Sequence, residues 1–164
     1  MHLIVKNLGT TKVFFSSDYH FGHVNILKYC DRPFTDIEEM NETIIQHHNK
    51  IVGPNDIMYF LGDFSFHDAH SLLERMNGNF IFVKGNHDHK TIKKLSVNYA
   101  IISYDKYKFL CVHKPQHIYG EFNLNIVGHV HTEWQYNSEL NAFNVGVDQN
   151  DFSPVSLDTL MAFV

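Results

Sequence analysis

Cysteine is scarce in this chain, which has only Cys30 and Cys111 among its 164 residues. Two cysteines so far apart do not have the short spacing of a thiolate metal site, and they are too few for the disulfide framework of a small secreted protein. We therefore expect both to behave as small hydrophobic side chains in the core.

Long hydrophobic runs are also missing. No apolar stretch approaches the roughly 20 residues that a membrane-spanning helix requires. The N-terminal stretch MHLIVKNLGTTK lacks the longer apolar segment and the small-residue cleavage site of a secretory signal. We therefore expect a cytoplasmic protein with no membrane partner.

Positive charge is in short supply. The chain has 13 lysine and arginine residues against 18 aspartate and glutamate residues, a formal net charge of −5 at pH 7 with histidine neutral. Proteins that mainly hold a nucleic-acid backbone cluster their basic residues, whereas no basic run here is longer than a pair. We therefore expect no tight binding to long nucleic acids.

The apolar pattern predicts one α/β domain over residues 1–164. A helix is clearest at 36–52, where apolar residues recur at helical spacing after a capping box formed by Thr35 and Glu38. Shorter helices are expected at 24–30, 67–76 and 91–95. Strands are expected at 12–17, 56–62, 80–85, 100–104, 108–113, 124–128 and 142–147, with one more within 152–164. This order favours a mixed sheet, or two packed sheets, flanked by helices.

Histidine is the residue in excess, with 13 copies, and it is both a common metal ligand and a proton carrier. Its positions are informative, because five of the predicted strands end in polar residues that could converge at one edge of the sheets. A glycine directly precedes the polar residue in three of the five. These strand-end residues are Asp18 and His20, then Asp63, then Asn86, His87 and Asp88, then His113, then His129 and His131.

The mixture of carboxylate, amide and imidazole groups predicts a particular class of metal. It suits manganese, iron or zinc, with nickel and cobalt as further candidates, and manganese is our first expectation. It contains too much nitrogen for calcium or magnesium. One ion cannot use so many ligands, whereas two ions that share a carboxylate can. Metal pairs about 3.5–4 Å apart stabilise in-line displacement at phosphorus.

These motifs, in this order, resemble those of the calcineurin-like metallophosphoesterase superfamily. The five matching blocks are Asp18-x-His20, Gly62-Asp63, Gly85-Asn86-His87-Asp88, His113 and Gly128-His129-x-His131. The string SDYHFGHVNI, followed by Arg32-Pro33-Phe34, resembles a small bacterial and phage single-domain branch. The resemblance implies a four-layer αββα sandwich of two mixed β-sheets flanked by helices.

The resemblance also implies a role for each strand-end residue. The first ion would be held by Asp18, His20, Asp63 and His131, and the second by Asp63, Asn86, His113 and His129. A hydroxide bridging the two ions would attack phosphorus, while His87 would stabilise the phosphoryl oxygens and protonate the leaving group. One position departs from the protein-phosphatase branch, because Phe66 replaces the acid that would orient the catalytic histidine.

Two further residues are candidates for binding the substrate. His23 could lie beside the metals, or it could cap the following helix, where Asn25 is an alternative cap. The guanidinium of Arg32 suits phosphate oxygens, although it could equally belong to a surface ion pair. Asp88 is expected to be a local structural acceptor.

The expected function is that of a binuclear-metal-dependent phosphoesterase, either a phosphodiesterase or a phosphatase, acting on a small phosphoester. A nuclease of the same superfamily would require a basic groove or an added DNA-binding domain, and the sequence shows neither. A non-catalytic scaffold on this fold would have lost some of the metal ligands or His87, and here all are present.

Overall fold

The computed structural model describes the backbone of residues 2–5 and the backbone and side chains of residues 10–164. Part of the N-terminal stretch used to argue against a secretory signal therefore lies outside the described residues. Within the described part of the chain, no helix is long and apolar enough to cross a membrane.

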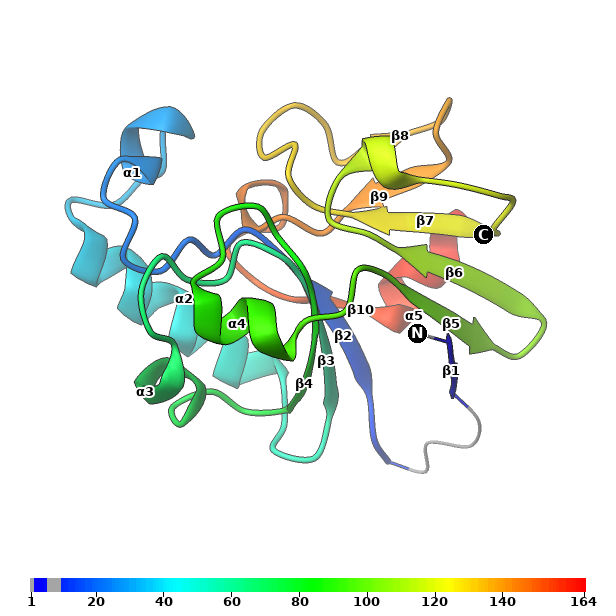
Figure 1. The fold of residues 1–164 in the computed structure, drawn as a ribbon, viewed down its shortest axis with the longest axis horizontal. Coiled ribbons are helices and arrows are strands. Elements are labelled where there is room, and N and C mark those ends of the chain that lie inside the picture. Colours follow the sequence, from blue (N-terminus) through cyan, green and yellow to red (C-terminus); the bar gives the residue numbers. More distant parts are fainter. Residues whose placement is uncertain (1, 6–9) are drawn as a thin grey trace.

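Two mixed sheets form the centre of the fold (Figure 1). The six-stranded sheet has the order β1 (His2–Val5), β5 (Ala100–Tyr104), β6 (Tyr107–Cys111), β7 (Leu124–Val127), β9 (Ala142–Asn144) and β8 (Tyr136–Asn137). The four-stranded sheet has the order β10 (Val155–Ser156), β2 (Val13–Ser16), β3 (Ile57–Leu61) and β4 (Asn79–Val83). Each sheet contains parallel and antiparallel pairs. The prediction of an α/β fold with two mixed sheets is therefore confirmed.

The main core lies between the two sheets. Strands buried on both faces explain the nearly continuous apolar runs of the sequence. From the four-stranded sheet, Phe15 and Tyr59 point into this core, and from the six-stranded sheet Phe109 and Ile126 do so. Cys111 is fully buried there, as expected for a small hydrophobic residue, whereas Cys30 is only partly buried.

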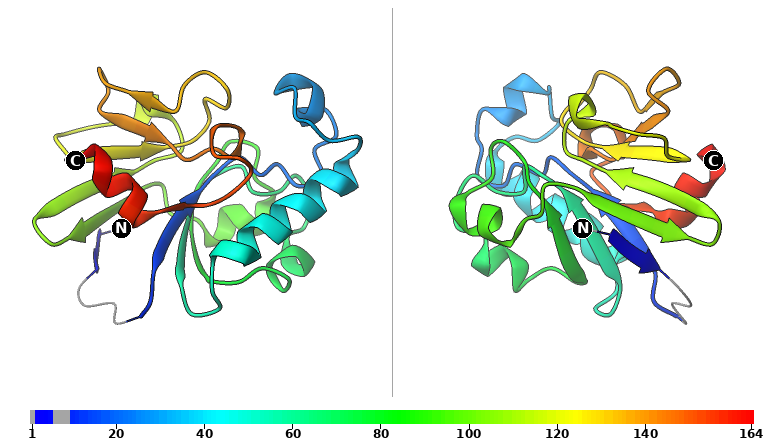
Figure 2. Two further views of the ribbon diagram at one scale, coloured as in Figure 1. Left: turned by 180° about the vertical axis from the view of Figure 1, so that it is seen from behind. Right: turned by 45° about the vertical axis from the view of Figure 1, so that its right-hand side comes forward.

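Helices cover the outer face of the four-stranded sheet, and both views in Figure 2 agree on this arrangement. They are α2 (Ile37–Ile51), α3 (His70–Leu73) and α4 (Lys90–Leu95), whereas α1 (Ile26–Tyr29) lies beyond the edge of the sheet. Met40 and Ile44 of α2 pack in one cluster with Phe14 and Phe60 of the sheet.

The outer face of the six-stranded sheet has a thinner cover than the four-layer expectation. Among the described residues, its cover is the 3-10 turn η1 (Pro115–His117) and the loops before and after β7, from which Phe122 and Trp134 pack on the strands. This cover suffices because the outer cluster is small, with Leu110 and Val127 among its few fully buried members.

One local prediction needs correction. The N-cap of α2 is Asp36, whose Oδ1 accepts the Glu39 N–H at 2.8 Å, while the Glu39 carboxylate reaches back to Thr35. The capping box therefore starts one residue later than expected.

The strand expected within 152–164 is present as β10. After it the chain forms α5 (Leu157–Leu160) and the 3-10 turn η3 (Met161–Phe163). Leu157 and Leu160 lie at helical spacing, and both are buried in the core between the sheets.

A buried hydrogen-bond chain connects α2 to the segment after β2. The Nε2 atom of His48 lies 2.7 Å from the Asn77 carbonyl oxygen, which can only accept, so Nε2 carries the proton. Its Nδ1 atom therefore accepts from the Tyr19 hydroxyl at 3.0 Å. His48 and Tyr19 are both fully buried, so His48 has a structural role.

Replacing Tyr19 with phenylalanine should destabilise the protein by about 1–3 kcal/mol, because it leaves a buried acceptor without a donor. Chemical denaturation followed by circular dichroism measures this loss. Tyr136→Phe removes an exposed hydrogen bond to Asn141 and serves as the control, expected within about 0.5 kcal/mol of the parent. Equal losses in the two variants would contradict the structural role of this chain.

Candidate metal centre

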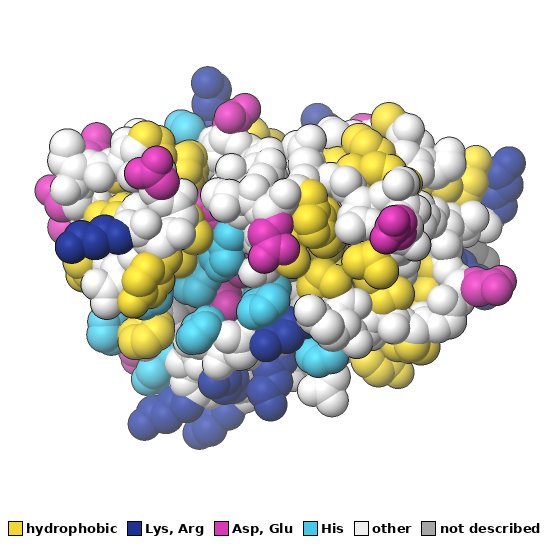
Figure 3. Space-filling model, turned by 90° about the horizontal axis from the view of Figure 1, so that it is seen from above, with side chains coloured by type: hydrophobic (Ala, Val, Ile, Leu, Met, Phe, Trp, Pro, Cys, Tyr) yellow, Lys and Arg dark blue, Asp and Glu magenta, His cyan; other side chains and the backbone are white. Residues whose placement is uncertain are grey.

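The carboxyl ends of five strands meet at one edge of the two sheets. Strands β2, β3 and β4 are mutually parallel, as are β6 and β7, so their following residues project to the same place. Figure 3 views this edge from above and shows histidine side chains gathered around a hollow with an acidic group at its base. The structure thus brings together the strand-end residues that the sequence singled out.

One group of possible ligands combines Asp18, His20 and His131, whose ligand atoms all lie within 4.8 Å of one another. The Nε2 atoms of His20 and His131 each lie 3.9 Å from Asp18 Oδ1. Asp18 and His20 are almost completely buried, while the His131 side chain is 22% exposed. Three such atoms around one point match the size of a divalent-ion site.

A second group combines Asp63, His113 and His129. His113 Nε2 lies 3.2 Å from Asp63 Oδ2 and 3.1 Å from Asn86 Oδ1, while its Nδ1 is 2.6 Å from the Leu61 carbonyl oxygen. Because a carbonyl oxygen can only accept, Nδ1 carries the proton, and Nε2 is free to act as a ligand. Asp63 Oδ2 is also 3.7 Å from His20 Nε2, so this carboxylate lies between the two groups.

The backbone turns sharply at these residues. Five of them have positive φ angles, which non-glycine residues adopt at a cost of about 1–3 kcal/mol each. These angles are 61° at Asp18, 54° at His20, 59° at Asp63, 72° at His129 and 44° at His131. Such strain persists only where the surroundings enforce it, and five such residues lie together at this site.

Backbone contacts and glycines enforce these turns. Asp18 donates its N–H to the Gly62 carbonyl, and His20 donates to the Asp63 carbonyl, both at 3.0 Å. A Cβ atom at Gly85 would overlap the backbone of Asp63, so only glycine allows these two turns to lie so close.

Three buried polar atoms at the centre have no hydrogen-bond partner: Asp18 Oδ1, His20 Nε2 and Asp63 Oδ2. Such atoms are rare and destabilising in folded proteins, and they call for an explanation. All three belong to the ligand groups, and two metal ions would satisfy them. The residues therefore fit the binuclear site that the sequence resemblance implies.

The electrostatics of the histidines differ across the site. Burial lowers the pKa of His20 to about 3 and that of His129 to about 4, so both rings are neutral at pH 7, as metal ligands must be. Burial also lowers the pKa of His131, but the hydrogen bond to Asp148, a contact with Cys30 and the charge of Asp18 together outweigh it and raise that pKa to about 10. At neutral pH an ion must therefore displace a proton from His131.

His87 lies at the rim of the hollow, with its ring centroid 5.8 Å from that of His20. Its backbone N–H donates to Asp63 Oδ1 at 2.8 Å, which fixes its place beside the ligands. The neighbouring Asp88 accepts from the backbone N–H groups of Asp63, Phe64 and Gly85, and so it is the structural acceptor that the sequence suggested.

Phe66 occupies the place at which the sequence departs from the protein phosphatases. Its ring stacks on that of His23, with centroids 4.7 Å apart and planes 5° from parallel. Among residues 10–164, no hydrogen bond to the His87 ring is present. The ring of His87 is therefore exposed to the hollow without an orienting acid.

A cavity of about 360 Å³ opens beside the ligand groups. It is lined by His20, His23, Ile26, Tyr29, Cys30, Asp63, His87 and residues 129–133. His23 Nδ1 is buried without a hydrogen-bond partner, and its ring forms part of this wall. His23 thus lies beside the site and does not cap α1.

Arg32 has a different place from the one expected for a substrate-binding residue. Its side chain is fully buried and donates twice to Asp148, at 2.8 and 3.0 Å. It also donates to the carbonyls of Asp18 and Tyr19 and to the sulfur of Met40. A guanidinium has five N–H donors, so none remains for a substrate phosphate. The expectation that Arg32 binds substrate is therefore corrected.

Asp148 is the residue of this site that the sequence analysis missed. It follows β9 within η2 (Val147–Gln149), and its Oδ2 is 2.8 Å from His131 Nδ1. The signal that could have found it is the same one used for the other ligands, because an acid follows an apolar strand and a glycine, Gly146.

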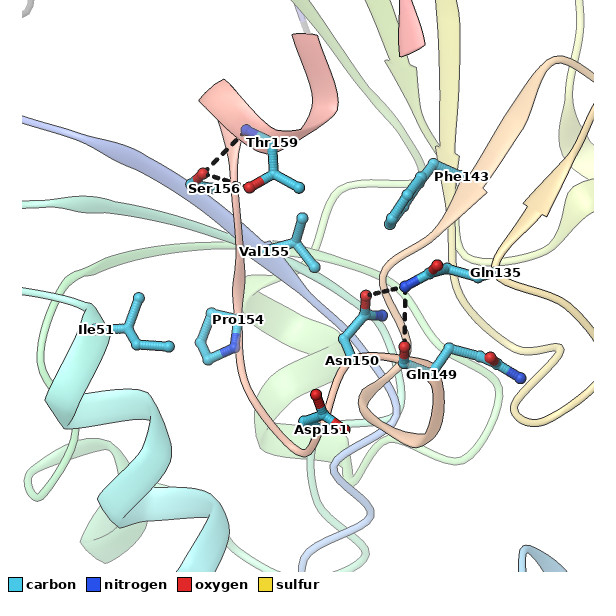
Figure 4. Close-up of a pocket in the computed structure, with 10 residues that line it drawn as sticks. All are labelled: Ile51, Gln135, Phe143, Gln149, Asn150, Asp151, Pro154, Val155, Ser156 and Thr159. Atoms are coloured by element: carbon cyan, nitrogen blue, oxygen red, sulfur yellow. Dashed lines mark hydrogen bonds between the residues drawn. The ribbon is translucent and has the colours of Figure 1, made fainter. Parts of the chain in front are cut away.

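A second cavity, of about 400 Å³, lies between the end of α2 and the β10 region (Figure 4). Its lining is rich in neutral amides, with Gln135 bonded to the Asn150 side chain and to the Gln149 carbonyl. Asp151 is its only ionisable lining residue, so this cavity has no cluster of catalytic or metal-binding groups.

Comparisons with known proteins place the chain in a family. No protein-family model matches it. Among solved structures, that of a protein of unknown function, AQ665 of Aquifex aeolicus, aligns with a TM-score of 0.78 and 25% identity over 94% of this chain and 100% of that one. A predicted phosphoesterase of Streptococcus pneumoniae TIGR4 aligns with a TM-score of 0.45 and 14% identity over 83% of this chain and 71% of that one. The uncharacterized protein MJ1445 of Methanocaldococcus jannaschii is 39% identical over 172 residues, covering 96% of this chain and 93% of that protein. The chain therefore belongs to the same protein family as MJ1445.

Proposed function

We propose that this protein is a metal-dependent phosphoesterase that hydrolyses a small phosphoester with two divalent ions. The observation that carries this proposal is the set of three buried, unpartnered atoms, Asp18 Oδ1, His20 Nε2 and Asp63 Oδ2. They lie at the strand ends where the motif order resembles that of the metallophosphoesterases.

The ligands divide into two sets that share Asp63. Manganese is the favoured metal, and iron, zinc, nickel and cobalt suit the same donors. Paired ions of this kind neutralise charge that develops at phosphorus and generate a nucleophile from water at neutral pH. One set is Asp18, His20, Asp63 and His131, and the other is Asp63, Asn86, His113 and His129.

The chain's own residues would then bind the substrate and move the proton. The exposed ring of His87, at the rim, would donate a proton to the departing oxygen of the ester. The ring of His23 lines the cavity and would contact the substrate beside the phosphoryl group. Tyr29 and Ile26 form the wall against which the rest of a small substrate would pack.

The size of the cavity favours a small substrate over a polymer. A volume of about 360 Å³ lies at the lower end of the range for ligand pockets. No lysine or arginine is among the residues that line this cavity. The cavity therefore lacks the basic groove that a nuclease would need.

We expect binding to a long DNA duplex to be weaker than about 1 μM at low salt, with a shallow dependence of log K on log salt. The excess of acidic residues is the reason. Fluorescence anisotropy with a labelled duplex, on protein treated with chelator to prevent cleavage, measures both quantities. Submicromolar binding with a steep salt slope would favour the nuclease.

Activity after metal exchange tests the proposed function. Protein stripped with chelator and reloaded with manganese should hydrolyse at least one member of a panel of phosphomonoesters and phosphodiesters, while the stripped protein should not. A fully loaded protein that turns over none of them would favour the non-catalytic scaffold.

A further inference from the structure

Arg32 and Asp148 form a buried ion pair directly behind one ligand group. Their side chains are 0% and 1% exposed, and two hydrogen bonds of 2.8 and 3.0 Å join them. Buried, two-pronged pairs of this kind fix geometry, because both charges are held in one orientation. Neither side chain faces the cavity, so neither would touch a substrate.

Asp148 sets the orientation of His131. Its Oδ2 accepts from His131 Nδ1 at 2.8 Å, which places the proton on Nδ1 and directs Nε2 toward Asp18 Oδ1. A carboxylate behind a histidine ligand fixes the ring and makes it a stronger donor, and losing it typically costs 10–100-fold in metal affinity.

Arg32 sets the orientation of the segment that carries the other two ligands of this group. Its NH2 donates to the Asp18 carbonyl at 2.7 Å, and its NH1 donates to the Tyr19 carbonyl at 2.9 Å. The backbone here is strained, with positive φ at Asp18 and His20 on either side of Tyr19. The two buried hydrogen bonds from Arg32 to the carbonyls of this segment can hold the strained backbone in place.

The other ligand group is supported differently. His113 is oriented by the Leu61 carbonyl, and Asp63 is held by the backbone N–H of His87. Within residues 10–164, neither Arg32 nor Asp148 forms a hydrogen bond with a ligand of that group. The two groups thus have separate supports.

We propose that Arg32 and Asp148 are positioning residues for the ion held by Asp18, His20 and His131, and that they set its affinity while leaving the other ion unaffected. This inference rests on the proposed function, because it requires that the protein bind two ions. It gives the buried arginine a role that substrate binding does not explain.

Metal titration of conservative variants tests this proposal. In Arg32→Lys and Asp148→Asn, manganese titration by calorimetry should show one of two ions bound about 10–100-fold more weakly, and the other within about twofold of the parent. The matched controls are Arg75→Lys and Glu42→Gln, which alter an exposed pair joined at 2.7 Å and should change neither affinity. Anomalous diffraction at limiting manganese should retain the peak beside His113 and lose the one beside His131.

The outcomes separate the two proposals. A parent protein that binds no manganese would overturn the proposed function. A parent that binds two ions, with both equally weakened or both unchanged in the variants, would overturn the positioning role alone. Circular dichroism checks that each variant is folded. If Arg32→Lys does not fold, the metal titration of Asp148→Asn, which keeps the shape of the side chain, tests the positioning role alone. If neither variant folds, the pair holds the fold rather than the metal, and the inference fails.

Discussion

Phosphoesterase activity is expected to fall about a thousandfold or more when Asp63 is replaced by alanine, a loss of several kcal/mol in transition-state stabilisation. Asp63 Oδ2 lies 3.7 Å from His20 Nε2 and 3.2 Å from His113 Nε2, and so it is the one carboxylate between both ligand groups. Its loss removes an anionic ligand from each ion. The variant should remain folded, because the Asp63 side chain is not part of the hydrophobic core between the sheets.

Activity and metal content must be measured on the same preparation. Elemental analysis after dialysis should show fewer than two manganese ions per chain for Asp63→Ala, together with the loss of turnover. Asp158→Ala, at an exposed position in α5, is the control and should keep both ions and full activity. An Asp63→Ala protein that retains two ions and more than about a tenth of the activity would contradict the bridging role.

The second large effect is expected at His87. With asparagine there, kcat/KM for alkyl phosphoesters should fall by roughly 10²–10⁴-fold, the usual contribution of a general acid. Nitrophenyl esters should lose much less, because nitrophenolate departs readily without a proton. Both ions should remain, since the link of His87 to the site is its backbone N–H on Asp63 Oδ1, which asparagine keeps.

The comparison of the two substrate classes is the measurement that matters. Both classes are assayed with His87→Asn and with the parent at equal metal content. His70→Asn, at a side chain 83% exposed on α3, serves as the control and should change neither rate. Equal losses on both substrate classes would mean that His87 mainly stabilises the phosphoryl oxygens. No loss on either class would mean that His87 has no role in catalysis.

The strand-end ligands could be predicted from sequence because the signal is local. Each ligand follows an apolar strand within a few residues, and three of the five blocks begin with glycine. Parallel strands then bring these ends together whatever the details of packing. The structure adds what the motif order could not, namely the positive φ angles at Asp18 and His131.

The Arg32 and Asp148 pair was beyond this approach because it is a long-range contact. The two residues are 116 positions apart, and guanidinium groups at phosphate sites and in buried ion pairs look the same in a sequence. Only the burial of the arginine distinguishes a phosphate-binding residue from a buried ion pair, and this burial depends on how α1 and η2 pack around the site. Asp148 carries the same strand-end pattern as the ligands, because it directly follows the expected strand 142–147, but it matches none of the five motif blocks.

The end of the chain shows a limit of periodicity. The stretch 155–164 mixes apolar and polar residues in a way that is compatible with a strand or a short helix. Tertiary packing decides for the helix, because Ser156 caps it through the Thr159 N–H and Phe163 packs on Phe143 with centroids 4.8 Å apart. Leu157 and Leu160 of this helix are then buried in the core between the two sheets.

Anomalous diffraction from crystals saturated with manganese tests the central claim most directly. The account predicts two peaks per chain, about 3.5–4 Å apart, with the Asp63 carboxylate between them. One peak would lie against Asp18, His20 and His131, and the other against Asn86, His113 and His129. A single peak under saturating manganese, or an Asp63 side chain turned away from both, would contradict the binuclear site.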